Sequence, residues 1–351
     1  MNKPTLSIVI PCLNESGTIK RSIGDAQLHA KKHFPNSFEI IVTDNGSTDG
    51  SQQIVKRCNN VRLIDVPVRG YGAALHWGIS KAKGKYVLFA DADLSYPFSN
   101  LRKLKPLLEQ EPDLLLGSRL KGKIQSGAMP FMHRYIGTPI LTVLIRLIYK
   151  IPTSDCNSGM RIVKKSFYKK LGMRNSGMEW ASELLLKTAI NHGKYLETPI
   201  RFIKDKRKSP PHLSTWSDGW RHFKSIFLLK PSSLHPLLLI FPILAYFFYQ
   251  FSFSLTVFFI LLTLVLILVL LTLELMRSAL DGGDSWASKL LKNNAVVPQV
   301  AILSMVGAIL VIVIPDTYLG TKLVLVSIVA IIYMWLFLIE TIKTHLINRL
   351  P

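Results

Sequence analysis

The last third of the chain contains four apolar stretches, and these limit the possible folds more strongly than any other feature. A helix that crosses the hydrocarbon core of a bilayer needs about 20 predominantly apolar residues. We place the four spans near residues 234–250, 253–275, 296–314 and 323–340. The first two could form one over-long helix, but Gln250, Ser252 and Ser254 lie between them and favour a turn. The sequence therefore predicts a C-terminal transmembrane bundle of about four helices over residues 233–345.

Charge divides the chain into two unequal parts. Residues 1–232 hold 37 Lys and Arg against 17 Asp and Glu, whereas residues 233–351 hold 6 against 5. The loop between the second and third spans carries Arg277, Lys289 and Lys292, and the tail carries Lys343 and Arg349. Because cytoplasmic loops collect Lys and Arg, both segments are expected in the cytosol. An even number of spans then leaves both termini and the basic N-terminal part there, in an integral protein that we expect in a bacterial inner (plasma) membrane.

The cysteines and the start of the chain agree with a cytosolic N-terminal part. Cys12, Cys58 and Cys156 are an odd number without C-x-x-C spacing, which argues against a disulfide framework or a zinc ribbon. No charged-then-apolar signal peptide opens the chain, because the apolar run at 6–11 is short and polar residues follow it at once.

Short apolar runs alternate with helical patterns in the N-terminal part. The runs lie at 6–11, 38–43, 61–66 and 86–90, and turn residues follow each of them. This pattern predicts an α/β domain over residues 1–205, with a mostly parallel, Rossmann-like sheet flanked by helices. Ligands of such sheets bind at the carboxyl ends of the strands. The candidate site therefore consists of the polar segments that follow three of the runs, at 12–16 (CLNES), 44–49 (DNGSTD) and 91–97 (DADLSYP).

Asp91 and Asp93 form a D-x-D pair directly after the fourth run. The motif alone is short enough to arise by chance, and an exposed polar loop is the alternative interpretation. At a strand end, however, two carboxylates can bind Mg²⁺ or Mn²⁺ that bridges a diphosphate. The position of the pair therefore favours a metal site.

Two segments have the pattern of helices that lie in the membrane interface. Residues 129–151 place Arg134, Arg146 and Lys150 among aliphatic residues and are interrupted at Gly137 and Pro139. Residues 206–232 form a basic, aromatic juxtamembrane segment. The alternative for both is an amphipathic helix packed on the sheet. Nearby basic residues are expected to meet an anionic lipid headgroup, or only to mark the cytosolic side: Arg201, Lys204, Lys206, Arg207 and Lys208.

Six ordered blocks carry a resemblance to a known family. They are SIVIPCLNE at 7–15, TDNGSTDGS at 43–51, GYGAALHWG at 70–78, DADLSYP at 91–97, LLGSR at 115–119 and DCNSGMR at 155–161. Together they resemble family 2 glycosyltransferases with the GT-A fold, and most of all the dolichyl- or polyprenyl-phosphate hexose synthases. The resemblance covers about residues 5–205.

The resemblance implies a role for each matching residue. Around the nucleoside of a nucleotide-sugar donor it places Pro11, Asn14, Glu15 and Asp44. It assigns Asp91 and Asp93 to the metal and the diphosphate. Arg119 and Arg134 are similar to the arginines that hold the donor and acceptor phosphates, so the expected catalytic residues are Asp93, Arg119 and Arg134.

Structural alternatives stay open for several of these residues. Glu15 could serve the dipole of a following helix, and Arg134 could touch lipid headgroups. Asp44 and Asp155 could each cap a turn of their own loop. Ser95 stands where the family often has Gln, which leaves the third protein ligand of the metal in doubt.

The resemblance implies an inverting transfer of a hexose from a UDP- or GDP-sugar to polyprenyl phosphate, with Mg²⁺ or Mn²⁺ as cofactor. The partners are then the donor, the lipid acceptor and the bilayer; no nucleic acid is expected, and a homo-oligomer is compatible with this interpretation. One alternative is a fused transferase and translocator of the lipid-linked sugar. Another is a glycosyltransferase that acts on a different lipid or glycan acceptor.

Overall fold

The computed structural model describes residues 3–207, 215–234, 236–248, 259, 262, 263 and 266. One compact unit contains Met1–Ile226, and the described residues that follow belong to a second unit. The predicted span at 234–250 includes helix α9 (Leu237–Phe248), after a single 3₁₀ turn, η4 (Pro231–Leu234). The other three predicted spans lie outside the described residues, apart from four isolated positions in the second span. Over the described ranges, no helix combines the length and apolarity needed to cross a bilayer.

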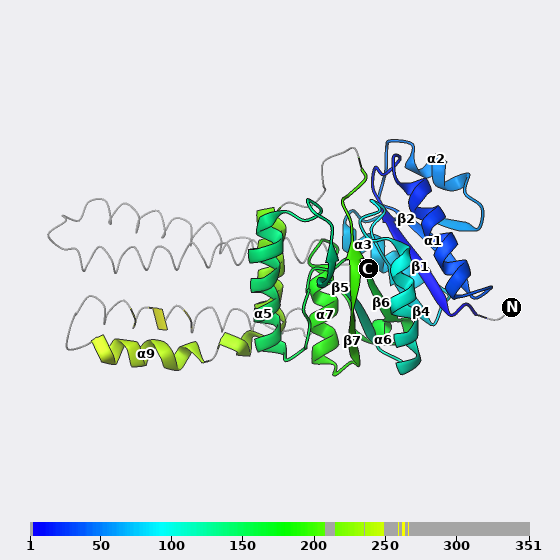
Figure 1. Ribbon diagram of the computed structural model, residues 1–351. Coiled ribbons are helices and arrows are strands. Elements are labelled where there is room, and N and C mark those ends of the chain that lie inside the picture. The colour runs from blue at the N-terminus through cyan, green and yellow to red at the C-terminus, as the bar shows by residue number, and fades with distance from the viewer. Residues whose placement is uncertain are drawn as a thin grey trace. The chain divides into compact units, whose positions relative to one another are not determined.

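The first unit is built around a seven-stranded sheet with the order β3-β2-β1-β4-β6-β5-β7 (Figure 1). All neighbouring strands run parallel except β6, which is antiparallel to both β4 and β5. The strands are β1 (Leu6–Cys12), β2 (Phe38–Asp44), β3 (Val61–Asp65), β4 (Tyr86–Phe89), β5 (Leu114–Ile124), β6 (Arg161–Lys164) and β7 (Tyr195–Phe202). The α/β prediction with a mostly parallel sheet is thus confirmed. The apolar runs indicated β1 to β4 but not the last three strands.

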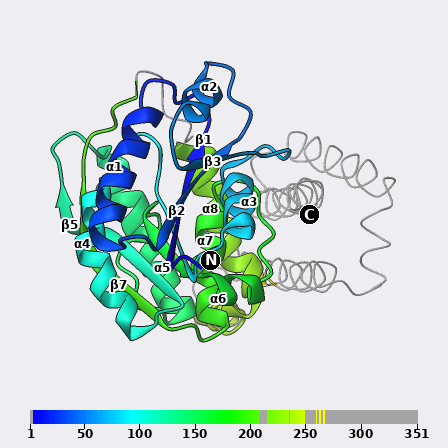
Figure 2. The same cartoon turned by 90° about the vertical axis from the view of Figure 1, so that its right-hand side faces the viewer.

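Helices cover both faces of the sheet. Those of the first unit are α1 (Ile19–His33), α2 (Ser51–Lys56), α3 (Tyr71–Lys81), α4 (Leu101–Leu104), α5 (Thr138–Tyr149), α6 (Lys165–Lys170), α7 (Trp180–Ile190) and most of α8 (Thr215–Leu229), with 3₁₀ turns η1 (Phe98–Asn100) and η2 (Lys105–Gln110) and a π turn η3 (His133–Gly137). Figure 2 shows α1 and α4 on one face and α3 and α7 on the other. Because both faces are covered, the side chains of Leu6, Ile8 and Val9 in β1 are all fully buried.

The chain reverses its direction of growth across the sheet between β1 and β4. From β1 it adds β2 and then β3 on one side, and it returns to place β4 on the other side of β1. A reversal of this kind opens a crevice outside the carboxyl ends of the two central strands, where ligands of open α/β sheets bind. The segments after β1 and β4 are those that contain Glu15 and the D-x-D pair.

Residues 131–149 form a helix with two apolar faces. Gly137 and Pro139 mark a change of helix type rather than a gap in the helix, contrary to prediction: the π turn η3 ends at Gly137, and α5 begins at Thr138 with Pro139 in its first turn, where a missing N–H is tolerated. The inner face is buried against the domain, and the outer face exposes large apolar side chains. The exposed residues, which we call the apolar outer face, are Phe131, Met132, Tyr135, Ile136, Ile140, Val143 and Leu147.

Helix α8 falls within the predicted juxtamembrane segment at 206–232. His222, Ser225 and Ile226 are buried in the first unit, where the His222 ring and the Ser182 hydroxyl of α7 are 2.7 Å apart. Trp220 is 46% exposed. One face of this helix is therefore packed on the first unit, as the amphipathic alternative expected.

Candidate active site

Asp91 and Asp93 lie in the loop at the carboxyl end of β4, where the order of the strands reverses. The Tyr71 hydroxyl, at the start of α3, donates a hydrogen bond of 3.0 Å to Asp91 Oδ1. Burial and the nearby charge of Asp93 raise the pKa of Asp91 to about 7. Two carboxylates held this close repel each other when both are ionised, so the pair is prepared for a cation.

Both oxygens of Asp93 already have partners. Its Oδ1 accepts the backbone N–H of Ser95 at 2.9 Å, and its Oδ2 lies 2.5 Å from Nη2 of Arg207. Ser95 turns its backbone to this carboxylate, and Asp93 is itself only 6% exposed. The D-x-D pair therefore lies in an ordered turn rather than in an exposed polar loop.

Asp44 is the last residue of β2 and is 1% exposed. Its Oδ2 accepts hydrogen bonds from the backbone N–H groups of Gly46 and Ser47 at 3.0 and 2.9 Å, and from the side chain of Gln52 at 2.7 Å. This is the turn cap that the sequence offered as an alternative. Oδ1, however, is buried and has no hydrogen-bond partner in the part of the chain that the structure describes. A buried carboxylate oxygen without a donor is costly, so it is suited to accept one from a ligand.

The other predicted nucleoside residues lie on or next to the end of β1. Pro11 is inside β1 and pairs with Thr43 of β2. Asn14 has a left-handed backbone, with φ of 54°, and its side-chain oxygen accepts the Thr48 N–H at 2.8 Å, so it braces the loops after β1 and β2. Glu15 is buried, and its Oε2 accepts the Thr18 hydroxyl at 2.8 Å. The structure therefore brings Asn14, Glu15 and Asp44 to one edge of the sheet.

Arg119 lies in β5, on the same edge as the carboxylates. The register from β4 through β6 to β5 aligns Phe89 with Arg161 and Leu116, so Arg119 extends past the level of Phe89, as Asp91 does. Its guanidinium is gripped by Asp155, with Nε to Oδ2 at 2.8 Å and Nη2 to Oδ1 at 2.7 Å. Asp155, expected to cap its own loop, is thus the partner that orients Arg119.

Arg134 forms no ion pair with this cluster among the residues that the structure describes. Its guanidinium lies over the ring of Tyr135, 5.2 Å from the centroid, in η3. The neighbouring His133 is influenced by the cluster, since burial and the charge of Arg119 lower the pKa of its imidazole. The sequence motifs did not indicate this histidine.

Arg207 joins the site, although the sequence placed it in the basic run that faces lipid. Its guanidinium lies 2.5 Å from Asp93, 3.3 Å from Glu15 and 2.7 Å from Asp205. Asp205, an acidic residue inside the basic run, is the only sequence signal that could have indicated this. The expected lipid contact of Arg207 is corrected accordingly, because its side chain is only 13% exposed and faces carboxylates.

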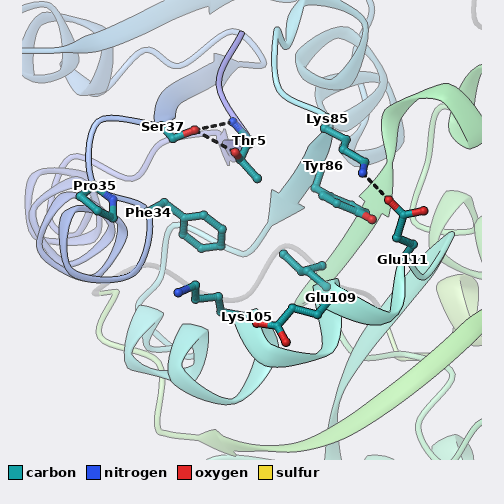
Figure 3. Close-up of a pocket in the computed structure, with 10 residues that line it drawn as sticks. Thr5, Phe34, Pro35, Ser37, Lys85, Tyr86, Lys105, Glu109 and Glu111 are labelled. Atoms are coloured by element: carbon teal, nitrogen blue, oxygen red, sulfur yellow. Dashed lines mark hydrogen bonds and ion pairs between the residues drawn. The ribbon is translucent and has the colours of Figure 1, made fainter. Parts of the chain in front are cut away.

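A separate pocket of about 450 Å³ lies at the opposite edge of the sheet, where β1 and β4 begin (Figure 3). Its walls include Phe34, Tyr86 and Lys105, and Lys85 pairs with Glu111 at its rim, 2.5 Å apart. None of the predicted site residues lines it. This pocket is therefore distinct from the crevice at the carboxyl ends of the strands.

The carboxylates fit a divalent cation only together with a ligand. Among the residues that the structure describes, no group of three or more His, Cys, Asp or Glu side chains could hold a metal ion. Mg²⁺ is usually bound through one or two carboxylates, with the remaining oxygens from substrate phosphates and water. Asp91 and Asp93 match that pattern, and the Arg207 guanidinium shows that a cation is accommodated beside Asp93.

Residues 7–172 match the family model described as glycosyl transferase family 2. These residues form a glycosyl transferase family 2 domain. The resemblance carried by the six sequence blocks is therefore confirmed, and so is the expectation that the protein is a glycosyltransferase.

Two named relatives align with this glycosyltransferase over more than half of its length. A low-salt glycan biosynthesis hexosyltransferase of Haloferax volcanii is 32% identical over 239 residues, which cover 66% of this chain and 55% of the relative. An undecaprenyl-phosphate 4-deoxy-4-formamido-L-arabinose transferase of Pseudomonas savastanoi is 29% identical over 216 residues, or 56% and 62% of the two chains. The chain thus spans between half and two thirds of the length of these two relatives.

A solved structure supports the fold of this glycosyltransferase. Glucosyl-3-phosphoglycerate synthase of Mycobacterium tuberculosis, in complex with Mn²⁺, UDP-glucose and phosphoglyceric acid, superposes with a TM-score of 0.51 at 20% identity. The match covers 64% of this chain and 79% of that one. The N-terminal domain is therefore GT-A-like, as expected.

Proposed function

We propose that this glycosyltransferase moves a hexose from a nucleotide diphosphate sugar to the phosphate of a polyprenyl phosphate at a membrane surface. One observation carries the proposal: the D-x-D pair and Arg119 lie on the same edge of the sheet, and the loop with Asp155, which binds Arg119, is hydrogen-bonded to a helix whose outer face is apolar and exposed. The acidic residues suit the diphosphate of an activated sugar with its cation, and the exposed apolar face suits an acceptor that stays in lipid. The undecaprenyl-phosphate relative supports the same class of acceptor.

The donor site is formed by the loops after β1, β2 and β4. Asp44 offers its unpartnered Oδ1 to an N–H of the nucleoside base, and Asn14 and Glu15 line the same edge. Asp91 and Asp93 would hold the divalent cation, Mg²⁺ or Mn²⁺, which when bound neutralises the diphosphate and stabilises it as a leaving group. Ser95 supplies a backbone N–H to Asp93 and no ligand of its own.

The acceptor side is formed by Arg119 and the helix at 131–149. The loop that holds Arg119 packs on α5, since the Cys156 N–H donates to the Thr142 hydroxyl at 3.3 Å. Seven exposed apolar side chains on the outer face would lie at the level of the lipid headgroups, with basic residues toward anionic lipid. A polyprenyl phosphate would then present its phosphate to Arg119 without leaving the bilayer. The proposed location is a bacterial plasma membrane with this domain in the cytosol.

The reaction needs alignment more than proton abstraction. A phosphate monoester has a second pKa of about 6, so its oxygen is largely ionised at neutral pH. That oxygen attacks the anomeric carbon from the side opposite the diphosphate, a new C–O bond forms, and the bond to the diphosphate oxygen breaks with inversion. Arg119 would hold the acceptor phosphate, and Asp93 would act on the donor diphosphate only together with a divalent cation. The fixed guanidinium stabilises negative charge on the phosphates and keeps the acceptor aligned.

The test is transfer of label from radioactive UDP- and GDP-sugars to polyprenyl phosphate in membranes that contain the protein, followed by extraction into organic solvent. We expect labelled lipid with one donor, and loss of that signal in Asp93→Asn. The control Glu109→Gln removes an exposed carboxylate at the opposite edge of the sheet and should keep full activity. Full activity of Asp93→Asn, or label only in water-soluble products with every donor, would overturn the proposal.

A further inference from the structure

The segment after β7 runs along the D-x-D loop and is tied to it by its backbone. The Ile203 N–H donates to the Ser95 carbonyl, and the Lys206 N–H donates to the Asp93 carbonyl, both at 3.0 Å. These two bonds bring residue 207 beside the carboxylates. The backbone at Arg207 is therefore fixed by hydrogen bonds of the fold, and its side chain does not extend from a flexible surface loop.

Each nitrogen of the Arg207 guanidinium faces a different carboxylate. Nη2 is 2.5 Å from Asp93, Nη1 is 3.3 Å from Glu15 and Nε is 2.7 Å from Asp205. The three acids come from the loops after β4, β1 and β7. Burial disfavours the charged guanidinium, but Asp93 and Glu15 outweigh it and raise the pKa of Arg207. The guanidinium therefore acts as the cation of the acidic crevice.

This arrangement conflicts with metal binding by Asp93. Oδ1 of Asp93 is engaged by Ser95 and Oδ2 by Arg207. A divalent cation that coordinates Oδ2 must displace a charge-assisted hydrogen bond. Glu15 and Asp205 stay near the rest of the guanidinium, but the displaced Nη2 must find another acceptor or lose its partner at 13% exposure. A diphosphate that arrives with the metal supplies such an anion in a geometry that a guanidinium fork matches.

We propose that Arg207 is a displaceable internal cation that occupies the metal position beside Asp93, so that the metal and the nucleotide diphosphate bind only together. The inference rests on the donor site proposed above and adds the order in which that site fills. Arg207 is a positioning residue here: its guanidinium stays paired with Asp93 until a diphosphate binds the guanidinium instead. The protein then avoids a tightly bound metal in the absence of donor.

The test is titration of the purified full-length protein with Mn²⁺, with free Mn²⁺ measured by electron paramagnetic resonance, without nucleotide and with saturating UDP or GDP. In the wild type, we expect weak binding of Mn²⁺ alone and binding at least about tenfold tighter with one of the nucleotides. In Arg207→Gln, Mn²⁺ alone should bind about tenfold tighter than in the wild type, because a competing charge-assisted bond is gone. The nucleotide should then add much less.

Two further variants keep the test decisive. Arg201→Gln removes an exposed arginine of β7 and should behave as the wild type, which controls for the change in net charge. Arg207→Lys keeps the charge but lacks the fork that reaches two carboxylates, so its Mn²⁺ affinity should fall between those of the wild type and Arg207→Gln. Thermal unfolding of each variant would verify that the domain is folded.

The outcomes separate this inference from the function on which it rests. If Asp93→Asn abolishes Mn²⁺ binding but Arg207→Gln binds Mn²⁺ alone no better than the wild type, the role of Arg207 is wrong and the metal site stands. If Asp93→Asn binds Mn²⁺ as the wild type does in every condition, the proposed donor site itself is wrong and the inference falls with it.

Discussion

Asp155 grips Arg119 through three hydrogen bonds, two to the guanidinium at 2.7 and 2.8 Å and one to the backbone N–H at 3.0 Å. Asp155 is fully buried and Arg119 is 8% exposed. A bidentate contact of this kind fixes the plane of the guanidinium and leaves its remaining N–H groups for a ligand. The DCNSGMR block is therefore physically linked to the GSR block, although 36 residues separate the two partners in sequence.

The first prediction concerns that pair. Asp155→Asn should destabilise the domain by about 3–5 kcal/mol, because it leaves a buried guanidinium without its counter-charge. The charge of Arg119 and its hydrogen bonds hold the pKa of Asp155 below its usual value despite burial. The wild type should therefore lose this part of its stability as the pH falls below about 4, toward the folded-state pKa, and the variant should not. Denaturant unfolding at pH 3 to 7 measures both effects, and parallel pH profiles of the two proteins would contradict the assignment.

The second prediction concerns Asp91 in metal-free protein. Its pKa is about 7 in the folded state, against about 3.9 in an unfolded chain. The folded state thus binds more protons between these values, and stability falls as the pH rises through them. Asp91→Asn should raise the unfolding temperature, with a gain that grows from pH 5 to pH 8. Asp65→Asn, which changes an exposed carboxylate at the end of β3, is the control and should show no such growth.

The third prediction concerns the nucleoside site. Asp44→Asn should weaken binding of the preferred nucleotide about tenfold or more. The carboxylate has one oxygen for the turn and one for the ligand, whereas the amide has a single acceptor oxygen and cannot serve both. Isothermal titration with UDP and GDP measures the effect. Asp49 lies in the same loop as Asp44, and its side chain accepts hydrogen bonds from Ser16, after β1, and from Ser51, at the start of α2, so it offers a matched Asp49→Asn variant. An equal loss in both variants would show that loop order, and not Asp44 itself, determines the affinity.

The fourth prediction concerns the apolar outer face. Leu147 is 71% exposed on α5, and Leu28 is 66% exposed on α1. Leu147→Glu should raise the KM for a long-chain polyprenyl phosphate in vesicles about tenfold or more, because the apolar contact of this side chain with lipid is lost. Transfer to a short, water-soluble prenyl phosphate should stay unchanged. Leu28→Glu should affect neither acceptor, and a comparable effect of both substitutions would argue against docking through α5.

The fifth prediction concerns the start of α3. Gly70 has φ of 134°, and a Cβ at this residue would lie 2.2 Å from the Ser176 carbonyl oxygen. Gly70→Ala should therefore destabilise the domain by about 3 kcal/mol or more and move Tyr71 away from Asp91. Gly24→Ala, in an open part of α1, should instead be neutral or stabilising. Thermal unfolding of the two variants compares them directly.

The sequence by itself determined the central sheet and the chemistry at its edge. The apolar runs that became β1 to β4 have no stable place except inside a covered parallel sheet, and the polar residues that follow them must then lie at its carboxyl edge. Asp44, Asp91 and Asp93 were predictable for that reason, because their location depends on local periodicity and on a general rule of α/β sheets.

Only the tertiary structure decided which charges meet. The sequence predicts a lipid contact for Arg207, within a basic run, and a turn cap for Asp155. In the structure, Arg207 pairs with Asp93 and Asp155 pairs with Arg119. Such pairs join residues 114 and 36 positions apart. Their formation depends on the order of β5, β6 and β7 in the sheet, which no local sequence pattern specifies. It also depends on burial, because an unpaired charge that is removed from water is costly and a carboxylate paired with a guanidinium avoids that cost.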